Sequence, residues 1–138
     1  MKLKIQLDDG AYMPVRAHAE DAGADIRTPV RVWLHPHSSC VIDTGVHCEI
    51  PRGYVGMLKS KSGLNIKHNI TSEGVVDAGY TGSIRVKLYN FGSMPYEFKI
   101  GDKVSQLVIM PIATPDFCIV GRIDGGERGD GGFGSTGR

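Results

Sequence analysis

The short spacing between glycine and proline residues constrains this fold more than any other feature. These residues recur every few positions, for example at Pro29, Pro36, Gly45, Pro51 and Gly53. No segment between them shows a long 3.6-residue apolar period. Many short strands joined by such turns are typical of a β-sandwich or barrel. We therefore expect an all-β chain.

Several segments have the pattern of strands. Ile84–Tyr89 alternates apolar and polar residues, the period of a half-buried strand. The other expected strands are Lys2–Leu7, Cys40–Ile50, Tyr54–Leu58 and Val104–Ile112, and the best helical candidate is a short turn at Ser62–Ile66. No repeat and no clear linker precede Arg122, so we predict one body over residues 1–121.

The last residues differ in composition from the rest. Glycine accounts for 19 of 138 residues, and many of them lie between Gly121 and Arg138. This tail has almost no apolar content, so it cannot form a core of its own. We expect residues 122–138 to be a flexible arm attached to the body.

Composition limits the partners and the location of the chain. A formal net charge of +1 gives no general attraction to nucleic acid or anionic lipid. The longest apolar run is far too short to span a membrane, and the first ten residues lack the apolar stretch of a signal peptide. We expect a cytoplasmic protein that binds neither nucleic acid nor membrane.

Glycine and short polar residues also gather in five segments that could carry chemistry. They are Ala19–Ile26, Lys59–Leu64, Gly74–Gly82, Gly101–Leu107 and the tail. The second offers cations and hydroxyls at a helix start, as phosphate sites do, although Ser-Gly turns are common. In the third, Asp77 follows apolar residues, and partial burial would make it a better base. In the fourth, Gln106 lies within an apolar strand and needs a hydrogen-bond partner.

These five segments resemble, in their order and in their amino-acid sequences, the five motifs of the trimeric dUTPases. They read A-E-D-A-G-A-D-I, K-S-K-S-G-L, G-V-V-D-A-G-Y-T-G, G-D-K-V-S-Q-L and R-G-D-G-G-F-G-S-T-G. The resemblance implies a distorted, jelly-roll-like β-barrel with a short helix, assembled as a homotrimer with its sites at subunit interfaces. It also implies Mg²⁺-assisted hydrolysis of dUTP to dUMP and pyrophosphate, which limits uracil in DNA and supplies dUMP for thymidylate synthesis.

The resemblance implies roles for individual residues. Asp77 matches the catalytic carboxylate, which would activate a water for in-line attack on the α-phosphate. Asp25 matches an aspartate that holds Mg²⁺ through water. The substrate-binding positions are Lys61, Ser62, Gly63, Thr71, Val75, Val76, Tyr80, Arg85, Gln106, Arg128, Phe133, Gly134 and Ser135.

Each part of the nucleotide has its own set of residues in this scheme. Main-chain groups from Val75 to Asp77 and near Arg85 would bind the uracil edge, and Tyr80 would pack under deoxyribose and exclude a 2′-hydroxyl. In the arm, Arg128 would bind the γ-phosphate and Phe133 would stack on uracil. Fifteen residues of an extended arm span at most roughly 50 Å, enough to reach a neighbouring subunit.

The sequence departs from the usual motifs at several positions. Ser60 and Lys61 stand where proline and arginine are usual, and a lysine lacks the bidentate fork of arginine. Thr71 lies where bacterial relatives often have asparagine. Ser105 differs from the residue that is usual at its position, which is neutral or small. Two alternatives remain open: a dCTP deaminase-like enzyme, and a nucleotide-regulated binding protein on the same fold.

Overall fold

The computed structural model describes residues 1–134 and 136–137. Within them, the elements in chain order are β1 (Ile5–Leu7), β2 (Gly23–Arg27), β3 (Val32–Leu34), β4 (Ser38–Asp43), β5 (Val46–Cys48), β6 (Tyr54–Lys59), α1 (Ser62–His68), β7 (Ile70–Val76), β8 (Arg85–Asn90), β9 (Tyr96–Phe98) and β10 (Lys103–Pro111). The expected all-β class with one short helix is confirmed.

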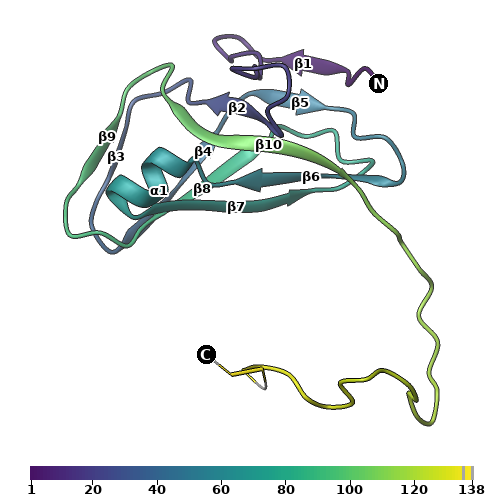
Figure 1. Cartoon of the computed structure of the whole chain (residues 1–138). Helices are drawn as coiled ribbons and strands as arrows, with labels where there is room; N and C mark the ends of the chain where they lie inside the picture. Colours follow the sequence, from purple (N-terminus) through teal and green to yellow (C-terminus); the bar gives the residue numbers. More distant parts are fainter. Residues whose placement is uncertain (135, 138) are drawn as a thin grey trace.

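Six of the strands form one antiparallel sheet in the order β2-β10-β6-β7-β8-β4. The sheet curls into a half-barrel, and the pairs β1–β5 and β3–β9 lie at its margins (Figure 1). Three of the neighbouring pairs, β2–β10, β10–β6 and β8–β4, join strands that are not consecutive in sequence, as in the jelly-roll-like barrel that we expect. This topology brings β2 and β10, which are far apart in sequence, side by side.

Alternating side chains of β8 show how the sheet forms its core. Val86, Leu88 and Asn90 are buried, whereas Arg85 and Lys87 are exposed, as the period-2 pattern predicts. The other fully buried large side chains are Ile26, Leu34, Ile42, Val46, Ile70, Ile84, Phe98 and Val104. Burying each such aliphatic side chain contributes about 1.5–3 kcal/mol before entropy costs.

Some strand predictions need correction. The run Cys40–Ile50 is two strands, β4 and β5, because Gly45 adopts a positive φ of 67° and interrupts the extended backbone there. Lys2–Leu7 shortens to β1. The strands β2, β3, β7 and β9 were not among the predicted strands. Strands β3 and β9 have only three residues each, and β2 and β7 each contain a glycine and an acid.

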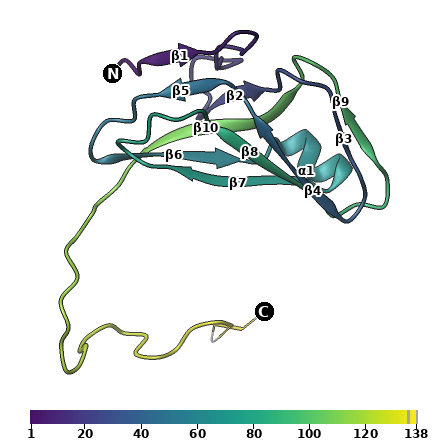
Figure 2. The ribbon, with the colours of Figure 1, turned by 180° about the vertical axis from the view of Figure 1, so that it is seen from behind.

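The chain after β10 lies apart from the sheet. Figures 1 and 2, which view the molecule from opposite sides, both show the tail running away from it. Between residues 113 and 134 no strand or helix forms, and Phe117, Ile119 and Ile123 are almost fully exposed. The domain boundary at residue 121 stays a prediction. Among the described residues, no helix is long and apolar enough to cross a membrane.

Candidate active site

Asp25 is the centre of a charged cluster between β2 and β10. The antiparallel register sets Asp25 opposite Gln106, and Asp25 is only 6% exposed. Its carboxylate accepts hydrogen bonds from Lys61 and, at 2.7 Å, from the Nζ of Lys103. Burial alone raises the pKa of Asp25, but the hydrogen bonds from Lys103 and Lys61 outweigh it and hold that pKa below its usual value. The carboxylate is therefore ionised at neutral pH.

We call Asp25, Lys61, Lys103 and Gln106 the Asp25 cluster. It lines a hollow of about 280 Å³ together with Ser62 and with residues in and just before the first motif, namely Ala17, Asp21, Ala22 and Gly23. The hollow thus contains two carboxylates, those of Asp25 and Asp21, two ammonium groups, a hydroxyl and an amide. The ammonium groups, the hydroxyl and the amide can donate hydrogen bonds to an anionic group such as a phosphate.

Gln106 has the hydrogen-bond partner that its position requires. Its Nε2 donates to the carbonyl oxygen of Ser60 at 2.9 Å. A Cβ at Gly23 would lie 2.2 Å from Gln106 Oε1, so glycine there leaves room for the amide. The amide of Gln106 thereby ties β10, the second strand of the sheet, to the loop that begins the second motif.

Three serines connect the same loop, which follows β6, to the neighbouring strands β7 and β10. Ser60 Oγ donates to the Ser72 carbonyl at 3.1 Å and accepts from the Ser72 amide at 2.9 Å. The hydroxyls of Ser72 and Ser105, both fully buried, lie 2.9 Å apart, and Ser105 also bonds the Lys59 carbonyl. Two departures from the usual motifs, Ser60 and Ser105, thus belong to one network with Ser72.

Helix α1 begins directly after this loop. Lys61 is the N-cap residue, Ser62 and Gly63 form the first turn, and Asn69 ends the helix in the left-handed conformation. The expected turn at Ser62–Ile66 is confirmed and is slightly longer. The helix therefore presents Ser62 beside the Asp25 cluster.

Strands β7 and β8 separate before they reach their connecting loop. Their pairing ends at Ser72↔Leu88, whereas β7 continues to pair with β6 as far as Val76. The backbone edges of β7 after Ser72 and of β8 before Leu88 therefore face each other across a gap. Thr71 lies just inside the paired part, and Val75 and Arg85 border the gap. A planar group with donors and acceptors can bond such edges.

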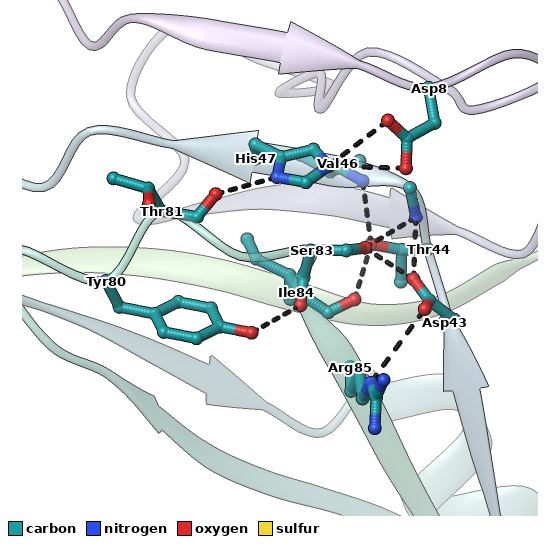
Figure 3. Close-up of polar contacts among 11 residues, drawn as sticks. Asp8, Asp43, Thr44, Val46, His47, Tyr80, Thr81, Ser83, Ile84 and Arg85 are labelled. Carbon is teal, nitrogen blue, oxygen red and sulfur yellow. Dashed lines mark hydrogen bonds and ion pairs between the residues drawn. The ribbon is translucent and has the colours of Figure 1, made fainter.

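We call residues 77–84 the tip loop. Asp77 is exposed, so the expectation of partial burial is wrong for the single chain. The side chain of buried Val76 points to the other face of the strand and does not cover Asp77. Tyr80, 46% exposed, donates its hydroxyl to the Ser83 carbonyl at 2.9 Å (Figure 3). A Cβ at Gly82 would lie 2.4 Å from that hydroxyl, so glycine there permits the tyrosine to fold back.

The Asp25 cluster and the tip loop lie at opposite ends of the β6–β7 pair. Lys59 is paired with Glu73 next to the cluster, whereas Gly56 is paired with Val76 next to Asp77. At about 3.3 Å per residue, the five steps along the chain from Gly56 to Lys61 correspond to roughly 16 Å. One chain therefore does not bring Asp77 to Asp25.

The predicted arm residues stay apart from both regions. Arg128, Phe133 and Gly134 are exposed in the tail, and Ser135 lies outside the described residues. The arm is therefore not docked on the body of its own chain.

Lys103, Ser60 and Ser72 were missed as site residues. Recognising Ala22–Ile26 as a strand would have revealed Lys103, because the pairing of β2 with β10 brings its ammonium to Asp25. The hydroxyls of Ser60 and Ser72 had no comparable signal, since their contact depends on strand register.

Known proteins match this chain over almost its full length. The family model for dUTPase matches residues 9–137. The chain belongs to the dUTPase family. A deoxyuridine 5′-triphosphate nucleotidohydrolase of Leifsonia xyli is 42% identical over 129 residues, which cover 91% of this chain and 85% of the relative. The mouse enzyme of the same name is 37% identical, and the match covers 97% of this chain and 83% of the mouse protein.

Solved dUTPases share the fold. A dUTPase mutant of Staphylococcus bacteriophage 80alpha with dUpNHpp has a TM-score of 0.93 and 33% identity over 99% of both chains. A mutant dUTPase from phage phi11 of S. aureus, described as coordinating a structural Mg(II) ion, has a TM-score of 0.84 and 33% identity, covering 91% of this chain and 100% of that one.

Proposed function

We propose that this protein hydrolyses dUTP to dUMP and pyrophosphate. The observation that carries the proposal is the match to the dUTPase family over residues 9–137, which includes every motif that the site uses. The same fold binds dUpNHpp in the phage 80alpha enzyme. In a cell, this reaction keeps uracil out of DNA and supplies dUMP for thymidylate synthesis.

The gap between β7 and β8 suits uracil. The edge of the base presents acceptor, donor and acceptor, and the free backbone groups of Val75, Val76 and Arg85 can supply the complement. Cytosine has the reversed pattern and would leave buried groups unpaired, which costs about 1–3 kcal/mol for each group. Thr71 lies at the closed end of the gap, and Tyr80 at its mouth would pack under deoxyribose.

The Asp25 cluster suits the triphosphate and its cation. Lys61, Ser62, Gly63 and Gln106 would bind phosphate oxygens. Within the described residues, no group of three or more His, Cys, Asp or Glu side chains forms a cage for a metal. Mg²⁺ commonly uses one or two carboxylates together with phosphates and water, so Asp25, whose oxygens already accept from lysines, fits an outer position. When bound, Mg²⁺ would neutralise phosphate charge.

Asp77 would act as the general base. Its exposed carboxylate is free to accept a proton from a water aligned with the α-phosphorus, a contribution of about 10²–10⁴ in rate. The water oxygen forms the new bond to phosphorus, and the bond to the bridging oxygen of pyrophosphate breaks. Arg128, Phe133, Gly134 and Ser135 would cover the γ-phosphate and the base and exclude bulk water.

Assembly of several chains would complete this site. The separation of Asp77 from Asp25 along β6 and β7 supports a site built from more than one subunit. The exposed Phe117, Ile119 and Ile123 also need a covering surface. A homotrimer with its sites at the interfaces satisfies both requirements.

A pyrophosphate-release assay with dUTP, dCTP, dTTP and UTP tests the proposal. We expect Mg²⁺-dependent release of pyrophosphate from dUTP, with the other three nucleotides far slower. Ammonia release from dCTP would instead support a deaminase, and orthophosphate release from dUTP would exclude attack at the α-phosphorus. Light scattering of the same sample gives the number of chains in the assembly.

A further inference from the structure

His47, on β5, connects the tip loop to the N-terminal part of the chain. Its Nδ1 lies 2.7 Å from the carbonyl oxygen of Thr81, the residue after Tyr80. Its Nε2 lies 3.2 Å from each carboxylate oxygen of Asp8. Figure 3 shows the imidazole ring between these two acceptors. The backbone of the tip loop therefore depends on a side chain from another strand.

Both ring nitrogens of His47 face oxygen acceptors. A neutral imidazole has one N–H and one lone pair, so one of these contacts would set a lone pair against an oxygen. The imidazolium donates to both. The hydrogen bonds to the Thr81 carbonyl and to Asp8 raise the pKa of His47 above its usual value, and partial burial opposes them less strongly.

The neighbouring charges favour the same form. Asp8 and Asp43 both attract the imidazolium. Lys4 and Glu49 border the same hollow as His47 but pair with each other at 2.8 Å. Arg85 lies 3.8 Å from the Asp43 carboxylate and balances part of its charge. The His47 side chain is 22% exposed, so these interactions are only partly screened by water.

The other anchors of the tip loop do not change charge between about pH 6 and 9. Ser83 Oγ donates to Asp43, and the amide of Ile84 donates to the Val46 carbonyl at 2.8 Å. These contacts fix the end of the loop that leads into β8. His47 fixes the part next to Tyr80, and its contact weakens when the ring loses its proton.

We propose that His47, as an imidazolium bridging Asp8 and the Thr81 carbonyl, is a positioning residue that fixes the Tyr80–Thr81 turn and sharpens selection of deoxyribose over ribose. This inference rests on the proposed function, because it assigns Tyr80 to the sugar. Selectivity for the 2′-deoxy nucleotide then falls as pH rises through the titration of His47.

Two measurements on the full-length protein test the proposal. NMR titration of labelled histidines should show His47 titrating above the usual value of about 6.5, and Asp8→Asn should lower its pKa. Calorimetry at pH 6 and pH 9 should compare dUpNHpp with the corresponding ribonucleotide. We expect the ratio of the two affinities to fall about three- to tenfold between these pH values, the factor that corresponds to one hydrogen bond.

Variants distinguish positioning from a structural role. His47→Gln should give a ratio that is independent of pH and equal to the wild-type ratio at pH 9, whereas the exposed His35→Gln should behave as wild type. Because the folded-state pKa of His47 is raised, the stability that His47 contributes is complete below the unfolded-state pKa of about 6.5 and is lost as pH rises through the folded-state pKa. The melting temperatures of wild type and His47→Gln should therefore converge towards pH 9.

A His47 pKa at or below the usual value would overturn the proposal, as would an affinity ratio with the same pH dependence in His47→Gln. These outcomes are separate from failure of the proposed function. A protein that binds dUpNHpp selectively but releases no pyrophosphate from dUTP would refute hydrolysis and leave the role of His47 to be decided by the affinity ratios. Binding of neither nucleotide would overturn both.

Discussion

The charged groups of the Asp25 cluster already have partners in the single chain, whereas Asp77 and Tyr80 at the other end of the β6–β7 pair are exposed. In the cluster, two lysines bond one buried carboxylate, and Gln106 bonds the adjacent loop. The tip loop is held by hydrogen bonds of its backbone and of Ser83 to other strands, whereas the Tyr80 hydroxyl bonds only within the loop and the Asp77 side chain is exposed. The groups that we propose for phosphate binding are thus organised within one subunit, whereas the groups that we propose for the reacting water and the sugar would need other chains to complete their surroundings.

Asp77→Asn gives the largest effect that this contrast predicts. Turnover of dUTP should fall about 10²–10⁴-fold, because the amide cannot accept the proton of the attacking water. Affinity for dUpNHpp should stay within a few-fold of wild type, since the Asp25 cluster is intact. Steady-state kinetics and calorimetry measure the two quantities, with Asp9→Asn, another exposed aspartate, as the control. Unchanged turnover would show that the base lies elsewhere.

Truncation after Ile123 should have the next largest effect. The body should fold and assemble as the full chain does, because the described residues after Ile123 form no hydrogen bond or ion pair with the sheet or the Asp25 cluster. We expect kcat/KM for dUTP to fall roughly 100-fold, since base–aromatic stacking alone contributes about 1–3 kcal/mol. Phe133→Ala in the full chain measures how much of this loss in kcat/KM is due to stacking of the aromatic ring on the base. Full activity of the shortened protein would mean that the arm is dispensable.

Ser105→Ala should have the smallest effect, and it should act on stability. It removes a partner of the buried Ser72 hydroxyl, at a cost of about 1–2 kcal/mol in the free energy of unfolding. The double variant Ser72→Ala/Ser105→Ala should lose less than the sum of the single variants, because neither hydroxyl is then left alone. Urea unfolding at a fixed protein concentration measures this, with the exposed Ser39→Ala as control. Additive losses would show that the two serines do not interact.

The sequence predicts the regular parts of this fold well. Strands β8 and β10 have clear apolar patterns, and Gln106 in β10 was expected to need a partner, which is Ser60. Strand β2 was mistaken for a turn because small residues and an acid dominate Ala22–Ile26. Its burial depends on lysines that reach Asp25 from the loop after β6 and from β10, which no local pattern reveals.

The separation of the two halves of the site could not be predicted from residue types. It follows from the register of β6 against β7, which depends on tertiary packing. The exposure of Asp77 has a similar origin, since neighbouring apolar residues in a strand point to the opposite face. The roles of Thr71 and the arm residues stay predictions.

The distance between Asp25 and Asp77 along one chain has a genetic consequence. If each site takes Asp25 from one subunit and Asp77 from another, a subunit with a substituted Asp25 inactivates one site of the assembly, and a subunit with a substituted Asp77 inactivates a different one. Two alleles, each inactive alone, would then complement each other when expressed together, because some mixed assemblies contain a site with both aspartates intact.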